Sequence, residues 1–420
     1  MRKTCVLIMV LALALAAVGI ANAASEAEKQ AAIQSGLSWL ASQQQAGGYW
    51  AYGGNERAST AAALLAFSEQ KLKPGGWFGA DYTAVVNNAA NFLLQQTKLF
   101  TYPSANWSGF SGVGYGFEWY GGDRNRSTYE SGLTIPALSR YAASLPGLGV
   151  NTVIAGTGNA NVDGKTYAEV IQRGVDSFIW GQRGPANGNF YGGWRYHPEW
   201  TDADNSTAQW PPVAMLYAKA LAGASVPAQT PSALQIWINY IQNDVSGGSG
   251  YDNPNNIVNE AKTGGLLIEM VFAGGGGDMA AALNYLNNNW LNTANSTWDG
   301  NFGHPYAMWS IYKGLESTIG LDDETTITNL HADPGDIDNP NHGWNWWEDY
   351  CNSLVDSQNA DGSWSGYSYW TGPLATAWDI NILNATAVPP PVIPIPGSVG
   401  LLGTGLLSLL GAGWWRRRKA

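Results

Sequence analysis

Two stretches near the ends of the chain share one pattern of apolar and polar positions. In each, apolar residues at helical spacing lead to a glutamine, a glycine-containing turn ends in tryptophan, and a second apolar stretch follows. The first stretch has Gln43 and the turn Gly47-Gly-Tyr-Trp50, and the second has Gln358 and the turn Asp361-Gly-Ser-Trp364. A unit present at both ends indicates an internal repeat of helix–loop–helix hairpins.

Four more hairpins of this kind fit between the two. Each hairpin alone is too short to bury its apolar face, so six in sequence are expected to close into a ring of two concentric helical layers. The pattern predicts a single all-α domain, an (α/α)6 toroid, over residues 24–386, with Trp50, Trp194 and Trp364 packed as wedges between neighbouring helices. The six predicted hairpins cover residues 36–67, 87–141, 170–221, 234–272, 278–315 and 350–383.

The glutamine and the Asp-Gly-Ser-Trp turn between two helices resemble the "QW" repeat of squalene cyclases and the related repeat of protein prenyltransferases. Proteins of those families fold as α/α toroids, so the resemblance implies the same fold over most of residues 30–386. It is specific for the fold and much less specific for the activity.

The first 23 residues have the features of an export signal. Arg2 and Lys3 precede an apolar run over residues 6–20, and Ala21-Asn-Ala23 has the small residues of a cleavage site. An uncleaved anchor is the alternative, but the run is short for a membrane span.

The last 34 residues are expected to form a linker and a membrane segment. Residues 387–396 are rich in proline and cannot form a helix. Residues 397–415 are uncharged and long enough to cross a bilayer as a helix, and Arg416-Arg-Arg-Lys419 would stay on the cytoplasmic side.

This order of proline motif, apolar helix and basic tail resembles the PEP-CTERM sorting signal, with Ile393-Pro-Ile-Pro396 as the motif. The Glu of the commonest version is missing here. The resemblance implies an exosortase as partner, transient anchoring in the inner membrane, and a final place in the periplasm, on the cell surface or outside the cell of a Gram-negative bacterium. A plain C-terminal membrane anchor is the alternative.

Charge and cysteine content narrow the function classes. The formal net charge is −11, and six basic residues lie in the two terminal segments, which contain no acid. The remaining body has 15 basic and 32 acidic residues, a net charge of −17, so it repels nucleic acid and anionic lipid. Cys351 is left without an intramolecular disulfide partner, because Cys5 lies in the signal.

The densest polar stretch, residues 193–210, is expected to lead into an inner helix at the mouth of the ring. Its candidate binding residues are Arg195, His197 and Trp200, and its candidate catalytic carboxylates are Glu199, Asp202 and Asp204.

Residues 202–208 resemble the Asp-x-Asp-Asp-Thr-Ala motif of class II terpene cyclases, in which the middle Asp protonates the polyene. That position would be Asp204, but Asn205 stands where the next Asp belongs. A carboxylate at a helix N-terminus is expected to have a lowered pKa, which disfavours a strong acid. We therefore expect Asp204 to cap the helix, with ligand contact and acid catalysis as alternatives.

Other predicted inner helices begin with similar polar and aromatic residues, which are expected to line the same mouth. No metal or cofactor site is predicted, because the four histidines lack ligand spacing and the oxygen-rich residues 333–341 lack the EF-hand order that would favour calcium. The further binding candidates are Arg124, Arg126, Glu130, His304, Tyr306 and the loop residue Trp344.

These patterns favour an exported toroid that binds an extracellular glycan or envelope polymer, because sugar rings stack on the aromatic side chains in which the loops are rich. The alternative is an enzyme, either a glycan hydrolase or lyase with two acids across one bond, or a terpene-cyclase relative with Asp204 as acid. A large apolar cavity would favour a terpenoid ligand, and a mouth lined with tryptophan and carboxylates would favour a glycan.

Overall fold

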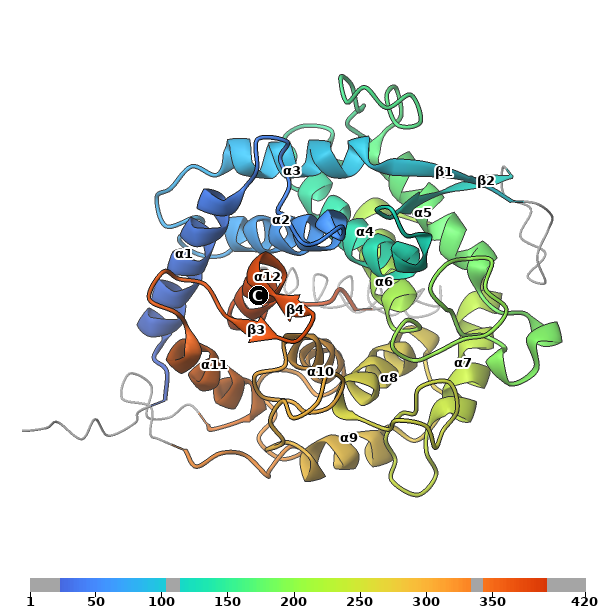
Figure 1. Cartoon of the computed structure of the whole chain (residues 1–420), viewed down its shortest axis with the longest axis vertical. Helices are drawn as coiled ribbons and strands as arrows, with labels where there is room; N and C mark the ends of the chain where they lie inside the picture. The colour runs from blue at the N-terminus through green and yellow to red at the C-terminus, as the bar shows by residue number, and fades with distance from the viewer. Residues whose placement is uncertain (1–22, 103–113, 334–342, 391–420) are drawn as a thin grey trace, which may run out of the picture.

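Twelve α-helices alternate between two concentric layers in the computed structural model, which describes residues 23–102, 114–333 and 343–390 (Figure 1). The inner helices are α2 (Glu56–Leu72), α4 (Ser127–Ala143), α6 (Trp210–Ala222), α8 (Glu260–Ala273), α10 (Pro305–Thr318) and α12 (Gly372–Leu383). The outer helices are α1 (Glu26–Gln43), α3 (Thr83–Gln95), α5 (Tyr167–Gly181), α7 (Gln229–Ile241), α9 (Met279–Asn288) and α11 (Trp346–Ser357).

The inner layer is a closed ring. Each inner helix packs against the next along the chain, and α12 packs against α2, α1 and α11. One hydrophobic core runs continuously from Ala32 in the first helix to Val388 after the last. The predicted (α/α)6 toroid of six hairpins is therefore confirmed by the packing of the helices.

Burial explains which helices lie inside. In α2, residues 57–70 are buried without a break, including the small residues 61–63 that let neighbouring backbones approach. In α1, by contrast, the buried apolar residues form one stripe of Ile33, Leu37 and Leu40. A helix that is buried on all sides lies in the interior, whereas a helix with a single buried stripe belongs to a covering layer.

Two short hairpins interrupt the helices and were not predicted. Strands β1 (Thr97–Thr101) and β2 (Tyr115–Trp119) pair antiparallel between α3 and α4. Strands β3 (Gly366–Tyr367) and β4 (Trp370–Thr371) pair directly before α12. The 3₁₀ helices η1 (Arg124–Arg126), η2 (Gly149–Asn151) and η3 (Pro185–Phe190) lie in other connections.

A glutamine at the end of four outer helices ties successive hairpins together. The amide nitrogen of each donates one hydrogen bond to a glycine carbonyl in its own loop and a second to a carbonyl at or next to the following outer helix. Gln358 closes the circle, because it donates to Gly362 O at 2.9 Å and to Ala32 O of α1 at 2.8 Å. The four glutamines are Gln44, Gln182, Gln242 and Gln358.

The loop position whose carbonyl accepts this bond tolerates no residue other than glycine. Gly362 has φ +91°, and a Cβ there would lie 2.5 Å from Ser35 O on the next outer helix, α1. Positive φ and close backbone approach both exclude other residues. Gly48, Gly192 and Gly247 have the same sign of φ and the same close approach to the next outer helix.

The loop tryptophans are packing residues, as predicted. Trp50, Trp194 and Trp364 are at most 3% exposed, and each indole nitrogen donates to a carbonyl of the preceding outer helix at 2.7–2.8 Å. The glutamine prediction was one residue off in the first hairpin. Gln44 makes the tie there, whereas Gln43 is exposed, because the pattern of apolar residues does not fix where the last helical turn ends.

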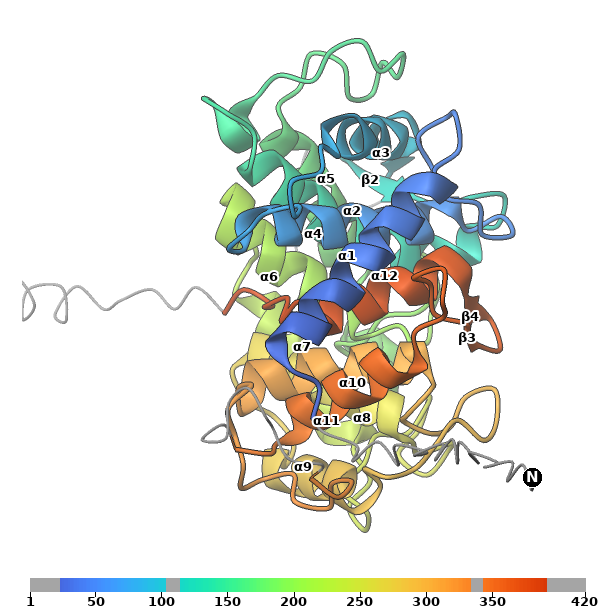
Figure 2. The ribbon, with the colours of Figure 1, turned by 90° about the vertical axis from the view of Figure 1, so that its left-hand side faces the viewer.

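The two faces of the ring differ. Inner helices begin on the face toward the viewer in Figure 1, and the described chain leaves from the opposite face, as Figure 2 shows in side view. Residues 384–388 cross that opposite face. Tyr217 donates to Ala387 O at 3.0 Å, Tyr312 donates to Thr386 O at 3.1 Å, and Val388 N donates to Glu316 at 3.1 Å. This end of the ring is thus covered by the chain itself.

The two terminal predictions fall outside the described residues. The export signal lies almost entirely in residues 1–22, and the sorting motif, membrane segment and basic tail lie in 391–420. Among the helices that the structure describes, none has the length and apolar character needed to cross a membrane. Cys351 is buried with a free thiol.

The glutamine tie predicts a sharp difference between two adjacent residues. Gln44→Ala removes hydrogen bonds to Gly48 O and Val85 O and should lower the free energy of unfolding by about 1–3 kcal/mol, because two carbonyls lose their donor. Gln43→Ala, the matched control, should change it by less than about 0.5 kcal/mol. Urea denaturation of both variants measures the difference, and equal effects would contradict the assigned tie.

Candidate functional site at the mouth of the ring

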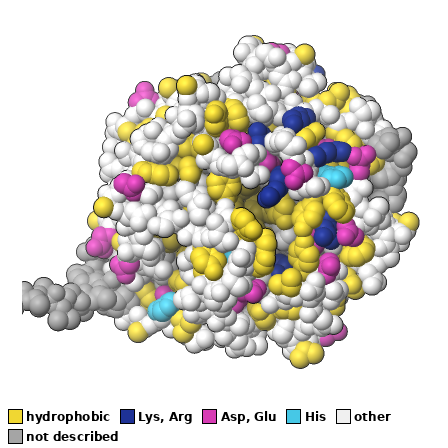
Figure 3. All heavy atoms as spheres, in the orientation of Figure 1, with side chains coloured by type: hydrophobic (Ala, Val, Ile, Leu, Met, Phe, Trp, Pro, Cys, Tyr) yellow, Lys and Arg dark blue, Asp and Glu magenta, His cyan; other side chains and the backbone are white. Residues whose placement is uncertain are grey.

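The starts of the inner helices gather polar and aromatic side chains at one mouth. Seen from that side, the surface is hollowed near its centre, hydrophobic side chains surround the hollow, and basic side chains lie beside it (Figure 3). The sequence placed its candidates at these helix starts, and the structure brings together those from the segments before α4, α6 and α10. Among them, Arg195 pairs with two of the candidate carboxylates, Asp202 and Asp204.

Two aspartates hold the Arg195 side chain. Its Nη1 lies 2.7 Å from Asp202 Oδ2, and its Nε lies 3.0 Å from Asp204 Oδ2. Asp204 is fully buried beneath the guanidinium, whereas the side chain of Asp202 is 31% exposed. One carboxylate therefore anchors the arginine from below, and the other reaches the surface beside it.

Three aromatic rings surround the same guanidinium. The guanidinium carbon lies 4.8 Å from the centre of the Tyr196 ring, 5.4 Å from Tyr251 and 5.7 Å from Trp200. All three rings are partly exposed. Cation–π contact and ion pairing together fix the arginine and orient the rings, which gives a preformed polar and aromatic surface.

Asp204 caps the turn that leads into α6. Its Oδ1 accepts hydrogen bonds from the backbone of Ser206 at 2.8 Å and of Thr207 at 3.1 Å, and from the Ser206 hydroxyl at 2.5 Å. The expectation of a lowered pKa was wrong. Burial raises the pKa of Asp204 to about 6, and its desolvation outweighs the hydrogen bonds and Arg195, which favour the ionised form.

Other arginines at this mouth also rest on buried carboxylates. Arg124 lies 2.7 Å from the buried Glu118 and also pairs with Glu199, whose side chain is 41% exposed. Arg57 Nε lies 2.6 Å from Glu130 on α4, and the burial of Glu130 raises the pKa of its carboxyl to about 7. Glu130 is therefore a partner of Arg57 inside the ring and not a surface group.

The histidines have different roles. His304 is fully buried, and its Nδ1 accepts from Ala307 N at 3.4 Å, which makes it the N-cap of α10. His197 is half-buried beside Trp200, with ring centres 5.6 Å apart, and burial and Arg124 lower its pKa. Of these two histidines, His197 is the one placed to touch a ligand at the mouth.

Tyr306 lies deeper in the mouth and Trp344 lies elsewhere. The hydroxyl of Tyr306 donates to Ser206 O at 2.9 Å and accepts from Gln209 at 2.9 Å, and its ring stacks on Trp370. Trp344 precedes the outer helix α11 and donates to His331 O at 2.9 Å. The structure thus does not bring Trp344 to the mouth, because its segment leads into the outer layer.

Arg126 and several unpredicted residues complete the surface. Arg126 is exposed at the end of η1, with no carboxylate within ion-pair distance in the part of the chain that the structure describes. Tyr251, Tyr196 and Tyr129 were not singled out from the sequence. The available signal was that tyrosines 196 and 251 lie in loops that precede inner helices, and Tyr129 begins one.

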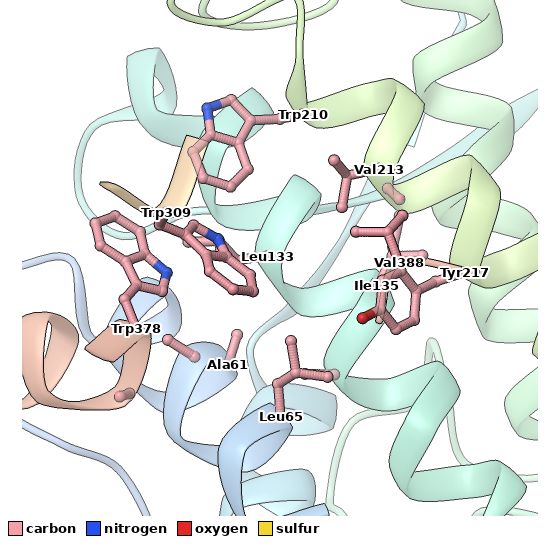
Figure 4. Packing of buried hydrophobic residues seen from close by; sticks show 14 of the residues in the cluster. Ala61, Leu65, Leu133, Ile135, Trp210, Val213, Tyr217, Trp309, Trp378 and Val388 are labelled. Carbon is pink, nitrogen blue, oxygen red and sulfur yellow. The ribbon is translucent and has the colours of Figure 1, made fainter. Parts of the chain in front are cut away.

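Below the mouth the ring is filled. The rings of Trp210, Trp309 and Trp378 converge from α6, α10 and α12 above the aliphatic side chains of Leu65 and Leu133 (Figure 4). The cavity that they line is small: the centre of a water molecule can move within only about 10 Å³ of it, so it has room for about one water. In the described parts of the chain, no group of three or more His, Cys, Asp or Glu side chains is arranged to hold a metal ion.

Comparison with known proteins gives only distant likenesses. No protein-family description matches the chain, and no curated protein matches it. Among solved structures, a GH76 alpha-mannanase from Bacteroides thetaiotaomicron is 11% identical, with 85% of this chain and 96% of that chain covered and a TM-score of 0.48. A type II terpene cyclase from Scytonema is 13% identical, with coverages of 86% and 98% and a TM-score of 0.32. At these identities and scores, neither likeness bears on the chemistry of this chain.

The raised pKa of Asp204 predicts a pH-dependent stability difference. Its folded-state pKa of about 6 exceeds the ordinary value of 3.8, so the stabilisation from its proton is present below about pH 4 and is lost as the pH rises through 6. Relative to that of Asp204→Asn, the free energy of unfolding of the unmodified protein should fall by roughly 2–3 kcal/mol between about pH 4 and pH 7. Denaturant titrations at several pH values measure this. A constant difference, or one of opposite sign, would show that the capping hydrogen bonds control the pKa.

Proposed function

We propose that the protein is an exported toroid that binds a carbohydrate of the cell envelope or surroundings at the mouth around Arg195. The observation that carries the proposal is the surface formed by Tyr196, Trp200 and Tyr251 around the fixed pair of Arg195 and Asp202. Aromatic faces stack on sugar rings, and a fixed arginine with a surface carboxylate offers donors and acceptors to hydroxyl groups.

The fixed geometry supports binding over flexible surface charge. Arg195 is held by a fully buried carboxylate, and the rings beside it contact each other as well as the guanidinium. The hydroxyls of Tyr196 and Tyr251 lie 2.5 Å apart. A site ordered before the ligand arrives loses less side-chain entropy on binding.

Two features favour this proposal over terpenoid chemistry. The axial cavity has room for about one water, whereas small-molecule sites have volumes of hundreds of Å³. Asp204 is fully buried behind Arg195, so its carboxyl does not reach the mouth to protonate a ligand. We assign Asp204 the role of a positioning residue for Arg195.

Export and sorting belong to the same proposal. Residues 1–23 have the features of an export signal, and the motif at 393–396 with the following apolar and basic segments has those of an exosortase substrate. The described chain leaves the ring on the face opposite the mouth. A protein tethered through its C-terminal segment would therefore present the mouth away from the membrane.

The first functional prediction concerns binding. The purified domain should bind one or more polysaccharides in a panel of neutral and acidic bacterial glycans, and Tyr196→Ala and Trp200→Ala should each weaken that binding by about tenfold or more, because each removes a stacking face. Calorimetric titration gives the affinities. Incubation with the same glycans, followed by analysis of chain length, shows in parallel whether the protein also cleaves them.

The matched control is Tyr82→Ala. Tyr82 is a half-buried tyrosine that follows the end of inner helix α2, the end away from the mouth, and precedes outer helix α3. Its removal should leave glycan affinity within about twofold. The proposal fails if no glycan of the panel binds, or if Tyr196→Ala and Trp200→Ala bind as well as Tyr82→Ala does.

Sorting predicts a processed C-terminus. Mass spectrometry of protein recovered from its native host should find no peptide beyond Gly397, because an exosortase would have removed that segment. Recovery of mature protein that retains Arg416-Arg-Arg-Lys419 would leave an ordinary membrane anchor as the explanation of the tail.

A further inference from the structure

An unbroken series of ring contacts crosses the mouth from one side to the other. Each ring in it contacts the next, with neighbouring ring centres 4.9–6.4 Å apart. The aromatic strip, as we name it, comprises in order Trp200, Tyr196, Tyr129, Trp210, Tyr306, Trp370 and Trp298.

The two ends of the aromatic strip are accessible, and Trp210 and Tyr306 in its middle are buried. Trp298 is 52% exposed, and the adjacent Tyr369, whose ring centre lies 5.8 Å away, is 66% exposed. At the other end Trp200 and Tyr196 are half-buried. In contrast, Trp210 is 1% exposed. A ligand lying on the strip would therefore meet open ring faces at two separated places.

The far end is built as firmly as the end at Arg195. Asn259 donates to Trp298 O at 2.8 Å, and the Trp298 ring packs 5.6 Å from Trp370. Tyr369 lies on the short connection between β3 and β4, and the hydroxyl of Tyr52 donates to its carbonyl. Exposed aromatic side chains held by this many contacts have a low entropy cost of binding.

We infer that the mouth binds a linear polysaccharide lengthwise, with one part of the chain on Trp200 and Tyr196 and a later part on Trp298 and Tyr369. This inference rests on the proposed function and goes further by assigning a polymer as the ligand. One sugar would need a single ring and its polar neighbours. Two exposed aromatic ends, linked by buried rings that fix their separation, suit a ligand that repeats the same stacking face along its length.

The test uses a ladder of oligosaccharides, from the disaccharide upward, made from the polysaccharide that binds best. Affinity for the unmodified protein should rise with length until the ligand spans both ends and then level off. Trp298→Ala and Tyr369→Ala should weaken binding of the longest oligosaccharide about tenfold and leave the shortest bound ones within about twofold. Trp200→Ala should weaken short and long ligands alike.

Two control variants isolate the stacking face. Tyr369→Phe keeps the ring and should retain the affinity of the unmodified protein for long oligosaccharides. Leu148→Ala removes a hydrophobic side chain of matching exposure, 67%, on the loop after α4, and should have no effect at any length.

The outcomes separate this inference from the proposed function. Affinity that does not depend on length, or equal losses in Trp298→Ala for short and long ligands, would overturn the lengthwise mode while leaving glycan binding intact. Absence of any binding by the unmodified protein would overturn both. If Tyr369→Ala instead turned a dimer into a monomer in sedimentation and left affinities unchanged, the exposed end would be a contact between two copies, and the inference would fall.

Discussion

The whole ring depends on a side-chain amide that bonds in two directions at once. Gln358 donates to a carbonyl of its own loop and to Ala32 O, 326 residues away in the sequence. The same bonds recur at Gln44, Gln182 and Gln242, each next to a glycine whose lack of a side chain lets the next outer helix approach. Four of the six outer helices are tied in this way to the following outer helix, and the tie of Gln358 joins the last unit to the first, so the repeated contact also closes the ring.

Closure determines where chemistry is possible. When hairpins alternate between two layers, all inner helices begin at one mouth and end at the other, and the polar residues before them converge there. At one end the chain itself covers the ring with residues 384–388. At the other end, arginines rest on buried carboxylates, as Arg195 does on Asp204 and Arg124 on Glu118. The buried acids hold the arginines in place, so the mouth is a rigid surface and the filled interior is its support.

The repeat made the fold predictable, because Gly-x-Trp turns with a preceding glutamine report packing that is independent of function. It also predicted which segments meet at the mouth.

The repeat did not show which glutamine of the first hairpin makes the tie, since Gln43 and Gln44 are equivalent in a pattern of apolar positions. It misjudged the pKa of Asp204, because hydrogen bonds to a helix start are visible in sequence and desolvation is not. Tyr251 was missed because a single tyrosine in a polar loop has no pattern. Trp344 was proposed as a binding residue from its place in an aromatic-rich loop, and the structure shows that this loop leads into the outer helix α11.

The central claim is that the mouth, including both ends of the aromatic strip, is the ligand-binding surface. Amide hydrogen exchange with and without a bound polysaccharide tests it most directly, because protection is read along the entire chain. We expect slower exchange in residues 195–206, 296–304 and 366–372, which lie apart in sequence and meet at the mouth. Protection confined to outer helices, or to the surface near His331 and Asp349 outside the ring, would contradict it.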